Sequence, residues 1–211
     1  MTTTGKVYGG AFDAQNHNNP RTIIGHWVPT DVAVLEVGPG DGVISRWLKE
    51  VKHCRTIGVE VVPEAVERMR TAFDHIIVGS IETESVVAQA RVYAPYDAII
   101  FADVLEHLVD PWSVLRQMRP LLSSTGRVLV SVPNVAHLTA RLNLLFGYFE
   151  YTDGYLMDRT HLRWFTHRSA KAMAHTTGYR VMAEATVYKP RLARFWPTLN
   201  GFQIVLNLAP A

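Results

Sequence analysis

Three of the nine histidines in this chain stand where acid–base chemistry is expected. His107 follows the apolar run 96–103, and His161 lies in the densest polar part of the segment 134–165, which is rich in aromatic residues. Imidazole titrates near neutral pH, so both side chains are suited to taking up a proton from a substrate. We take His107 and His161 as the candidate catalytic residues, with His137 as a weaker third candidate.

A glycine-rich stretch suits the binding of a ligand against bare backbone. Residues Val34–Gly42 read Val-Leu-Glu-Val-Gly-Pro-Gly-Asp-Gly, and residues 43–50 continue with apolar side chains at helical spacing. A strand, a glycine turn and a helix in this order begin a βαβ unit, in which a nucleotide-like ligand lies against the turn. Each glycine removes a Cβ, and the helix N-terminus offers unpaired N–H groups.

The spacing of these glycines differs from the G-x-G-x-x-G of dinucleotide sites. Glu36 at the end of the strand repels a pyrophosphate but attracts an α-ammonium group. A second acidic residue, Glu60, ends the predicted strand 55–60, where a carboxylate accepts hydrogen bonds from ribose hydroxyls. Together the two carboxylates favour a ligand with an amino-acid end and a nucleoside end.

With Glu36, Gly38, Gly40 and Gly42 in this order, the sequence resembles the class I S-adenosylmethionine-dependent methyltransferases, and in particular the small-molecule O-methyltransferases. The resemblance covers residues 30–185. It implies an α/β, Rossmann-like fold with a doubly wound, seven-stranded, mostly parallel sheet whose last strand is antiparallel. It also implies S-adenosyl-L-methionine as the methyl donor and S-adenosyl-L-homocysteine as the product.

The same resemblance implies which residues hold the donor. They are Glu36, Gly38, Gly40, Glu60, Val61, Ser80, Ile81, Ala102 and Asp103. Ser80 stands where the family often carries an aspartate, and its hydroxyl is able to bond an adenine edge. The segment 103–108, Asp-Val-Leu-Glu-His-Leu, is expected beside the donor methyl group.

Asp103, Glu106, His107 and His161 are also similar to an acidic-x-x-Glu-His pattern with a later histidine. That pattern occurs in metal-dependent 2′-O-methyltransferases of small RNAs and partly in quinone O-methyltransferases, although the first position here is aspartate rather than glutamate. Imidazole is a softer ligand than a hard cation such as Mg²⁺ prefers. We therefore expect no bound metal and interpret Glu106 and His107 as residues of the pocket wall.

The length of 211 residues suits one domain, residues 1–211, with no internal boundary. Within it the resemblance assigns residues 1–28 to a lid over the donor, with Tyr8 and Asn16–Asn19 as candidate lid residues. The segment 134–165 is expected to cover or form the acceptor pocket.

Composition limits the partners of the protein. Lys and Arg exceed Asp and Glu by 21 to 19, so no strong overall field attracts nucleic acid or a membrane surface. No apolar run reaches the length of a membrane-spanning helix, so we expect no membrane insertion. Cys54 is the single cysteine, which is typical of a reducing cytoplasm. The expected partner is a small-molecule acceptor, with nucleic acid unfavoured and the oligomeric state undetermined.

Two alternatives stay open. The first is an RNA or protein methyltransferase, which a cluster of arginines supports: Arg159, Arg163, Arg168, Arg191 and Arg194. The second is a non-catalytic protein that binds S-adenosylmethionine and regulates something else. The identity of the methyl acceptor is beyond the sequence, because one fold carries many acceptor pockets.

Overall fold

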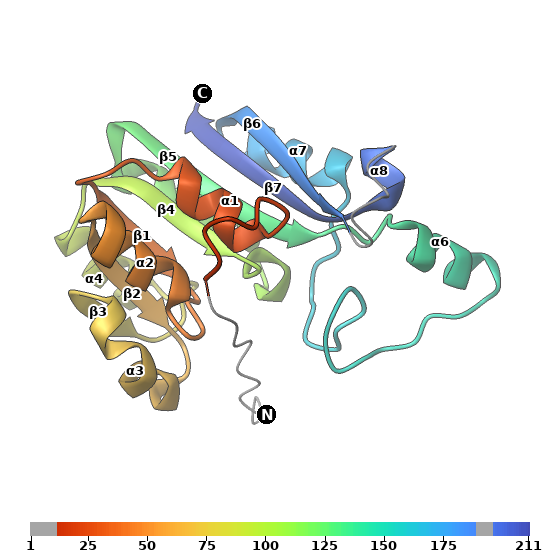
Figure 1. Ribbon diagram of the computed structural model, residues 1–211, viewed down its shortest axis with the longest axis horizontal. Helices are drawn as coiled ribbons and strands as arrows, with labels where there is room; N and C mark the ends of the chain where they lie inside the picture. Colours follow the sequence, from red (N-terminus) through yellow and green to blue (C-terminus); the bar gives the residue numbers. More distant parts are fainter. Residues whose placement is uncertain (1–11, 189–195) are drawn as a thin grey trace.

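A seven-stranded sheet runs through the molecule in the computed structural model, which describes residues 12–188 and 196–211 (Figure 1). The strands are β1 (Ala33–Val37), β2 (Arg55–Glu60), β3 (His75–Val78), β4 (Tyr96–Ala102), β5 (Leu122–Pro133), β6 (Tyr179–Tyr188) and β7 (Gly201–Pro210). Their order in the sheet is β3-β2-β1-β4-β5-β7-β6. Strands β1 to β5 pair in parallel, whereas β7 is antiparallel to both β5 and β6. The predicted fold class is therefore confirmed.

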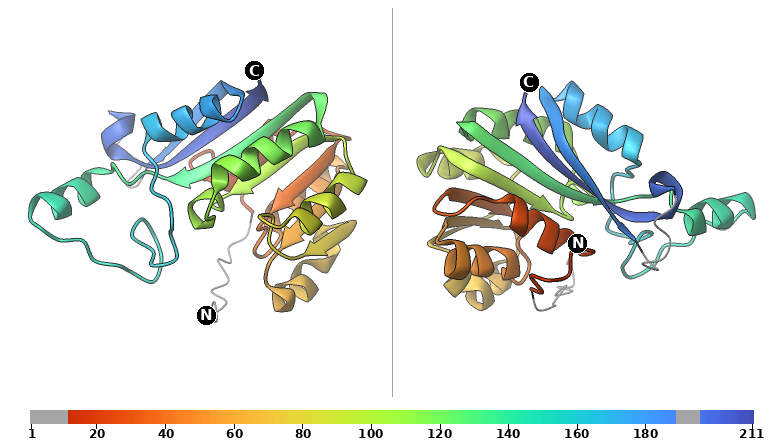
Figure 2. Two further views of the ribbon diagram at one scale, coloured as in Figure 1. Left: turned by 180° about the vertical axis from the view of Figure 1, so that it is seen from behind. Right: turned by 45° about the horizontal axis from the view of Figure 1, so that its top comes forward.

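Helices cover both faces of the sheet (Figure 2). One face carries α1 (Pro20–Trp27), α2 (Val43–Lys52) and α3 (Pro63–Met69), and the other carries α4 (Glu84–Val92), α5 (Pro111–Met118) and α7 (His167–Thr176). Short 3-10 turns follow α3, β4 and α5: η1 (Arg70–Ala72), η2 (Leu105–His107) and η3 (Arg119–Leu121). The two remaining helices, α6 (Leu138–Leu145) and α8 (Pro197–Asn200), flank the end of the sheet where β5 finishes and β7 begins.

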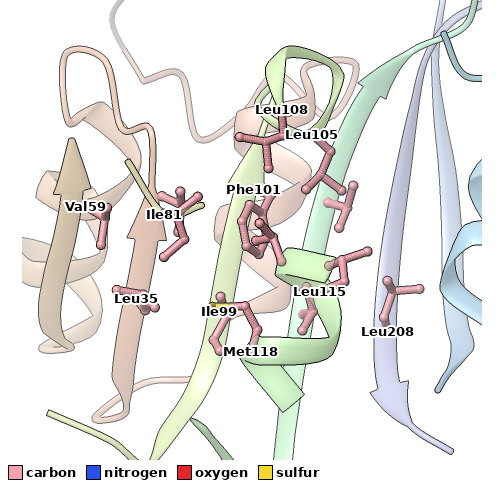
Figure 3. Packing of buried hydrophobic residues seen from close by; sticks show 14 of the residues in the cluster. Leu35, Val59, Ile81, Ile99, Phe101, Leu105, Leu108, Leu115, Met118 and Leu208 are labelled. Atoms are coloured by element: carbon pink, nitrogen blue, oxygen red, sulfur yellow. The ribbon is translucent and has the colours of Figure 1, made fainter. Parts of the chain in front are cut away.

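Alternation along the central strand β4 explains the two helical layers. Ile99 and Phe101 point to the side of α4, α5 and α7, where they join the larger hydrophobic cluster (Figure 3). Ala98 and Ile100 point to the opposite side, toward α1 and α2. All four side chains are buried, as expected for a parallel strand covered on both faces. Removing the buried ring of Phe101 would cost about 3–5 kcal/mol of stability.

The N-terminal part of the described chain lies on the sheet. Residues Pro20–Trp27 of this part form the helix α1. Asn19 caps it by accepting a hydrogen bond from the Arg21 N–H at 2.9 Å, and Pro20 occupies the first turn. Ile24 buries the inner face of this helix against the sheet. The helix thus holds the side chain of Arg21 in a fixed place.

Asn18 fastens the same segment to the edge strand β6. Its side-chain amide donates to the Tyr188 carbonyl at 2.9 Å and accepts from the Tyr188 N–H at 3.0 Å. Tyr8, the other predicted lid residue, lies outside the described residues.

The segment 134–165 leaves the sheet after β5 and returns to it at α7. It carries α6 away from the sheet and comes back as a long loop (Figure 1). Its return is fixed by Thr166, which caps α7: its Oγ1 accepts from the Ser169 N–H at 3.1 Å, and Ser169 Oγ accepts from the Thr166 N–H at 2.8 Å. Across both described ranges, none of the helices combines the length and apolar character that a membrane crossing requires.

Candidate active site

A cavity of about 530 Å³ lies at the carboxyl ends of the parallel strands, the edge at which α/β sheets bind ligands. Eight of the residues singled out in the sequence line it: Glu36, Gly38, Gly40, Ala102, Asp103, Glu106, His107 and His161. The sequence reasoning gave no specific role to several other lining residues, among them Arg21, Pro133, Asp153, Phe202 and Gln203. The cavity has the size of a small-molecule site.

The turn after β1 brings bare backbone to this cavity. Gly38 and Gly40 both have a φ of +63°, a conformation that L-residues avoid. A Cβ on Gly38 would come within 2.8 Å of Val104 Cγ2, whereas a Cβ on Gly40 would meet no described atom within 4 Å. Gly38 is therefore required by packing. Gly40 leaves open space beside the backbone.

Glu36 lies at the end of β1 on the face toward α2. Its Oε2 accepts two hydrogen bonds from Ser45 of that helix, from the hydroxyl at 2.5 Å and from the N–H at 3.2 Å. Burial raises the pKa of Glu36 to about 7, and the bonds from Ser45 offset only part of this effect. Because Oε2 is committed to α2, Oε1 is the oxygen left for a ligand.

Arg21 of α1 lines the same part of the cavity. Its guanidinium lies 3.6 Å from the Asp41 carboxylate, and its charge is one of the influences that oppose the raised pKa of Glu36. The wall thus offers a cation next to an anion, a combination that suits a zwitterion such as the amino-acid end of the donor. The sequence reasoning missed Arg21, since an arginine on a short helix carries no signal of its own.

The two candidate catalytic histidines come together on the other side of the cavity. Their ring centroids lie 4.8 Å apart with an edge-to-face angle of 69°. The Glu106 carbonyl holds them there, because it accepts hydrogen bonds from the Leu162 N–H at 2.7 Å and the Arg163 N–H at 2.9 Å. These bonds fasten the returning loop to η2, so His161 lies next to His107.

The hydrogen bonds of the two rings define their tautomers. Nδ1 of His161 lies 3.3 Å from the Leu156 carbonyl, and Nδ1 of His107 lies 3.2 Å from the Thr160 carbonyl. A carbonyl only accepts, so a neutral ring donates from Nδ1 and keeps Nε2 as its basic nitrogen. Burial and the neighbouring His107 lower the pKa of His161, which favours the neutral, basic form.

Glu106 completes this group. One ligating atom each of Glu106, His107 and His161 lies within 4.8 Å of the other two. The Glu106 side chain is buried, and its Oε2 has no hydrogen-bond partner among the described residues. Burial, and then the charge of Asp103, raise the pKa of Glu106 well above its usual value. Because its Oε2 is unpaired and lies beside two imidazoles, the Glu106 carboxyl is able to change its protonation state when a charge forms on one of these rings.

Asp103 is held differently from the other three members of the acidic and histidine pattern. Its φ of +57° is a left-handed conformation, which is unusual for aspartate. Ser131 donates to Oδ1 at 2.7 Å, and the side-chain amide of Gln203 donates to both carboxylate oxygens at 2.8 and 2.9 Å. Asp103 is therefore tied to β5 and β7.

Four of the predicted donor-binding residues lie beyond this cavity: Glu60, Val61, Ser80 and Ile81. They follow the neighbouring strands β2 and β3, where the Gly79 N–H donates to the Glu60 carbonyl at 2.8 Å. The Glu60 carboxylate is buried and accepts from the Val62 N–H at 2.8 Å. These strand ends continue the sheet edge past Gly38, whose N–H donates to the Val59 carbonyl.

His137, the third histidine candidate, does not line the cavity. It caps α6, with Nδ1 2.9 Å from the Thr139 hydroxyl, and its ring packs edge to face on Phe202. A structural role accounts for these contacts.

The doubly wound sheet with antiparallel β7, the glycine turn after β1 and the acid that ends β2 define the class I S-adenosylmethionine-dependent methyltransferases. A family model described as a methyltransferase domain matches residues 18–184, and the chain belongs to that family. The methyl donor of the class, S-adenosylmethionine, is its cofactor.

Curated relatives are similar over part of their length. A ubiquinone biosynthesis O-methyltransferase of Xylella fastidiosa (strain M23) is 30% identical over 106 residues, which are 48% of this chain and 42% of that protein. The enzyme of the same name from Histophilus somni is 30% identical over 111 residues, 50% of this chain and 46% of the relative. The matches thus span less than half the length of these relatives.

Solved structures agree in fold. A putative methyltransferase of Haloferax volcanii, solved in complex with the Trm112 methyltransferase activator, aligns with a TM-score of 0.63 at 15% identity, covering 94% of this chain and 92% of that one. The 1,6-didemethyltoxoflavin-N1-methyltransferase of Burkholderia thailandensis, solved with bound 1,6-didemethyltoxoflavin and S-adenosylhomocysteine, aligns with a TM-score of 0.62 at 16% identity, covering 94% of this chain and 81% of that one.

Proposed function

We propose that this protein transfers a methyl group to a hydroxyl group of a small molecule such as a sugar, polyketide or quinone precursor. The observation that carries this proposal is the pair of imidazoles of His107 and His161, which lie next to each other on one side of the cavity. An oxygen acceptor must lose a proton as it is methylated, so it needs a base more than an amine does. The names of the curated relatives, which are O-methyltransferases, support the same choice.

The strand ends and the glycine turn hold the donor in this proposal. Glu36 binds the α-ammonium group through Oε1, Arg21 binds the carboxylate, and Gly38 and Gly40 supply the backbone surface. Glu60 accepts the ribose hydroxyls. Val61, Ser80 and Ile81 surround the adenine ring of the donor, and Ala102 and Asp103 complete the wall of the donor site. The bound donor supplies an electrophilic methyl group on a positively charged sulfur.

His161 is the proposed base. Its Nε2 is unprotonated in the neutral tautomer and takes the proton of the acceptor hydroxyl, while the bond from Nδ1 to the Leu156 carbonyl fixes the ring. His107 packs against it, and an oxygen of the Glu106 carboxyl lies within 4.8 Å of both imidazoles, where its ionised form would stabilise the imidazolium that forms. Tyr155 and Phe202 give the wall an aromatic surface for the acceptor.

A direct assay tests the proposal. Purified protein is incubated with S-adenosylmethionine and a panel of phenols, catechols, sugars, hydroxy acids and amines, and S-adenosylhomocysteine is measured. Methylation of at least one hydroxyl compound, with an ether in the product by mass spectrometry, is the expected result. Products only from amines, RNA or protein would reject O-methylation of small molecules. Donor binding without any product would favour a non-catalytic regulator.

A bound divalent cation is the second candidate for stabilising the negative charge that develops on the acceptor oxygen. The observation in its favour is the buried Glu106 Oε2, which has no partner among the described residues and lies in a cluster with two imidazoles. Against it, the carboxylate of Asp103, the first residue of the pattern, already accepts hydrogen bonds from Ser131 and Gln203. We therefore keep base catalysis without a metal as the proposal. We also propose a cytoplasmic location, because a reducing compartment suits the free thiol of Cys54.

A further inference from the structure

We propose that Gln203 is a specificity-determining residue that recognises a hydrogen-bond donor, a hydroxyl or N–H, on the acceptor molecule. This inference rests on the proposed small-molecule methylation and adds which chemical group the acceptor must carry. No motif in the sequence pointed to Gln203, which is a polar residue in a mostly apolar strand.

The orientation of the Gln203 amide follows from Asp103. The Gln203 Nε2 lies 2.8 and 2.9 Å from the two oxygens of the Asp103 carboxylate. An ionised carboxylate only accepts hydrogen bonds, so the nitrogen of the amide, and not its oxygen, must face it. Ser131 of the intervening strand β5 donates to the same carboxylate, in agreement with an acceptor-only group. Asp103 thus fixes the orientation of the amide, with Nε2 toward the carboxylate and Oε1 away from it.

The remaining polar atom of the side chain is Gln203 Oε1. No residue in the described ranges donates a hydrogen bond to it, and Gln203 lines the cavity. A ligand that contacts the amide therefore meets an oxygen. Such an oxygen pairs with a hydroxyl or N–H, whereas an ether or carbonyl oxygen placed there has no proton to share and loses its own water.

The strand order puts Gln203 on the acceptor side. The donor elements, β1, β2 and β3, lie on one side of β4, and β5 and β7 lie on the other. Because β7 is antiparallel, its first residues stand at the carboxyl edge of the sheet, with Gln203 paired to Pro133 at the end of β5. Both residues line the cavity on the side away from the glycine turn.

Asp103 is well suited to fixing an amide. Its left-handed backbone at φ +57° is held by hydrogen bonds from its own N–H to the carbonyl and hydroxyl of Ser131, both at 3.1 Å. The carboxylate cannot turn away without breaking the contacts to Ser131 and Gln203. The specificity element is therefore a rigid three-residue chain, Ser131–Asp103–Gln203, whose free end is the amide oxygen.

The experiment measures fragment binding, so it does not need a turnover assay. Protein saturated with S-adenosylhomocysteine is titrated with catechol, guaiacol and veratrole, which carry two, one and no hydroxyls on the same ring, and affinities are measured by saturation-transfer NMR. In the wild type we expect affinity to fall in that order, by about threefold to tenfold from catechol to veratrole. In Gln203→Met, which keeps the size of the side chain, the three affinities should become equal.

Two further variants complete the design. Gln89→Met, at an exposed glutamine of α4, is the control and should keep the wild-type order. Asp103→Asn allows the amide to turn over, because an asparagine nitrogen can donate to Gln203 Oε1, and we expect the preference for hydroxyls to disappear or reverse. This variant tests the orientation argument if Gln203→Met does not fold.

Each outcome bears on one proposal. An unchanged order in Gln203→Met or in Asp103→Asn, or binding of none of the three probes to the loaded wild type, would overturn the role of Gln203. Failure of the proposed function has a different signature: the panel assay yields no methylated hydroxyl compound, whatever the fragments do.

Discussion

The imidazole rings of His107 and His161 meet edge to face with their centroids 4.8 Å apart. One ring belongs to the turn after the central strand, and the other to a loop that leaves the sheet and returns to it. Backbone hydrogen bonds from Leu162 and Arg163 to the Glu106 carbonyl join the two segments. The proposed base is thus assembled by the return of the segment 134–165, and it depends on that segment keeping its place.

Replacing His161 should slow methyl transfer without loosening the donor. We expect His161→Ala to reduce kcat by about 10²- to 10⁴-fold, the range for loss of a general base, with the Kd for S-adenosylhomocysteine within about twofold of the wild type. Calorimetry and steady-state rates measure the two quantities. His175→Ala, on the exposed side of α7, is the control. An unchanged kcat in His161→Ala would move the role to His107 or to a proton path through water.

Gly40 should be essential for donor binding and not only for the turn. Gly40→Val places a branched side chain in the space beside the backbone, and we expect no detectable heat with S-adenosylhomocysteine. Gly147→Val is a matched control, since Gly147 has a φ of +81° and a Cβ there would also meet no described atom within 4 Å. Both variants should lose about 1–2 kcal/mol of stability from backbone strain. Equal binding in both would place the donor elsewhere.

Donor affinity should rise with pH through the titration of Glu36. Burial raises the pKa of Glu36 to about 7, and only the ionised form pairs with the α-ammonium group. We expect the Kd for S-adenosylhomocysteine to fall as pH increases through about 7, and this dependence to be absent in Glu36→Gln. Glu64→Gln, at an exposed position in the first turn of α3, should titrate like the wild type.

The stability of the free protein should change in the opposite direction. The folded state holds the Glu36 proton more tightly than the unfolded chain, whose pKa is near 4.5. This contribution to the free energy of unfolding is fully present below pH 4.5 and is lost as pH rises through about 7. Melting temperatures of wild type and Glu36→Gln across this window measure it. A difference that grows in favour of the wild type with rising pH would contradict the assignment.

Glu60→Ala tests the ribose contact. Loss of hydrogen bonds from a charged acceptor should weaken S-adenosylhomocysteine binding by about 1.5–3 kcal/mol, measured by calorimetry. Glu50→Ala, at an exposed position near the end of α2, is the matched control. Because the Glu60 carboxylate also accepts from the Val62 N–H, the melting temperature should be recorded to confirm that the variant is folded. Undiminished affinity would remove Glu60 from the donor site.

Treatment with a chelator distinguishes catalysis by a histidine base from catalysis that needs a bound divalent cation. If His161 acts as a base without a metal, treatment with EDTA followed by desalting should leave kcat/KM unchanged, and added Mg²⁺, Mn²⁺ or Zn²⁺ should not increase it. Loss of activity with EDTA that one of these ions restores would place a cation among Glu106, His107 and His161, the one cluster of suitable groups among the described residues.

Local sequence patterns indicated the fold and the outline of the proposed donor site. The apolar strands, the glycine turn at Gly38 and Gly40, and the acidic strand ends Glu36 and Glu60 all act over a few residues, so spacing alone predicts them. The observed sheet has the expected seven strands, with the last strand antiparallel.

Tertiary structure decided the proposed acceptor side and the charges around the proposed donor site. Arg21, Gln203 and the pairing of His107 with His161 depend on contacts between segments far apart in the chain, and no spacing rule encodes such contacts. The orientation of the Gln203 amide depends on Asp103, a residue of another strand. The pKa shifts of Glu36 and Glu106 arise from burial, which exists only once the chain has folded around them.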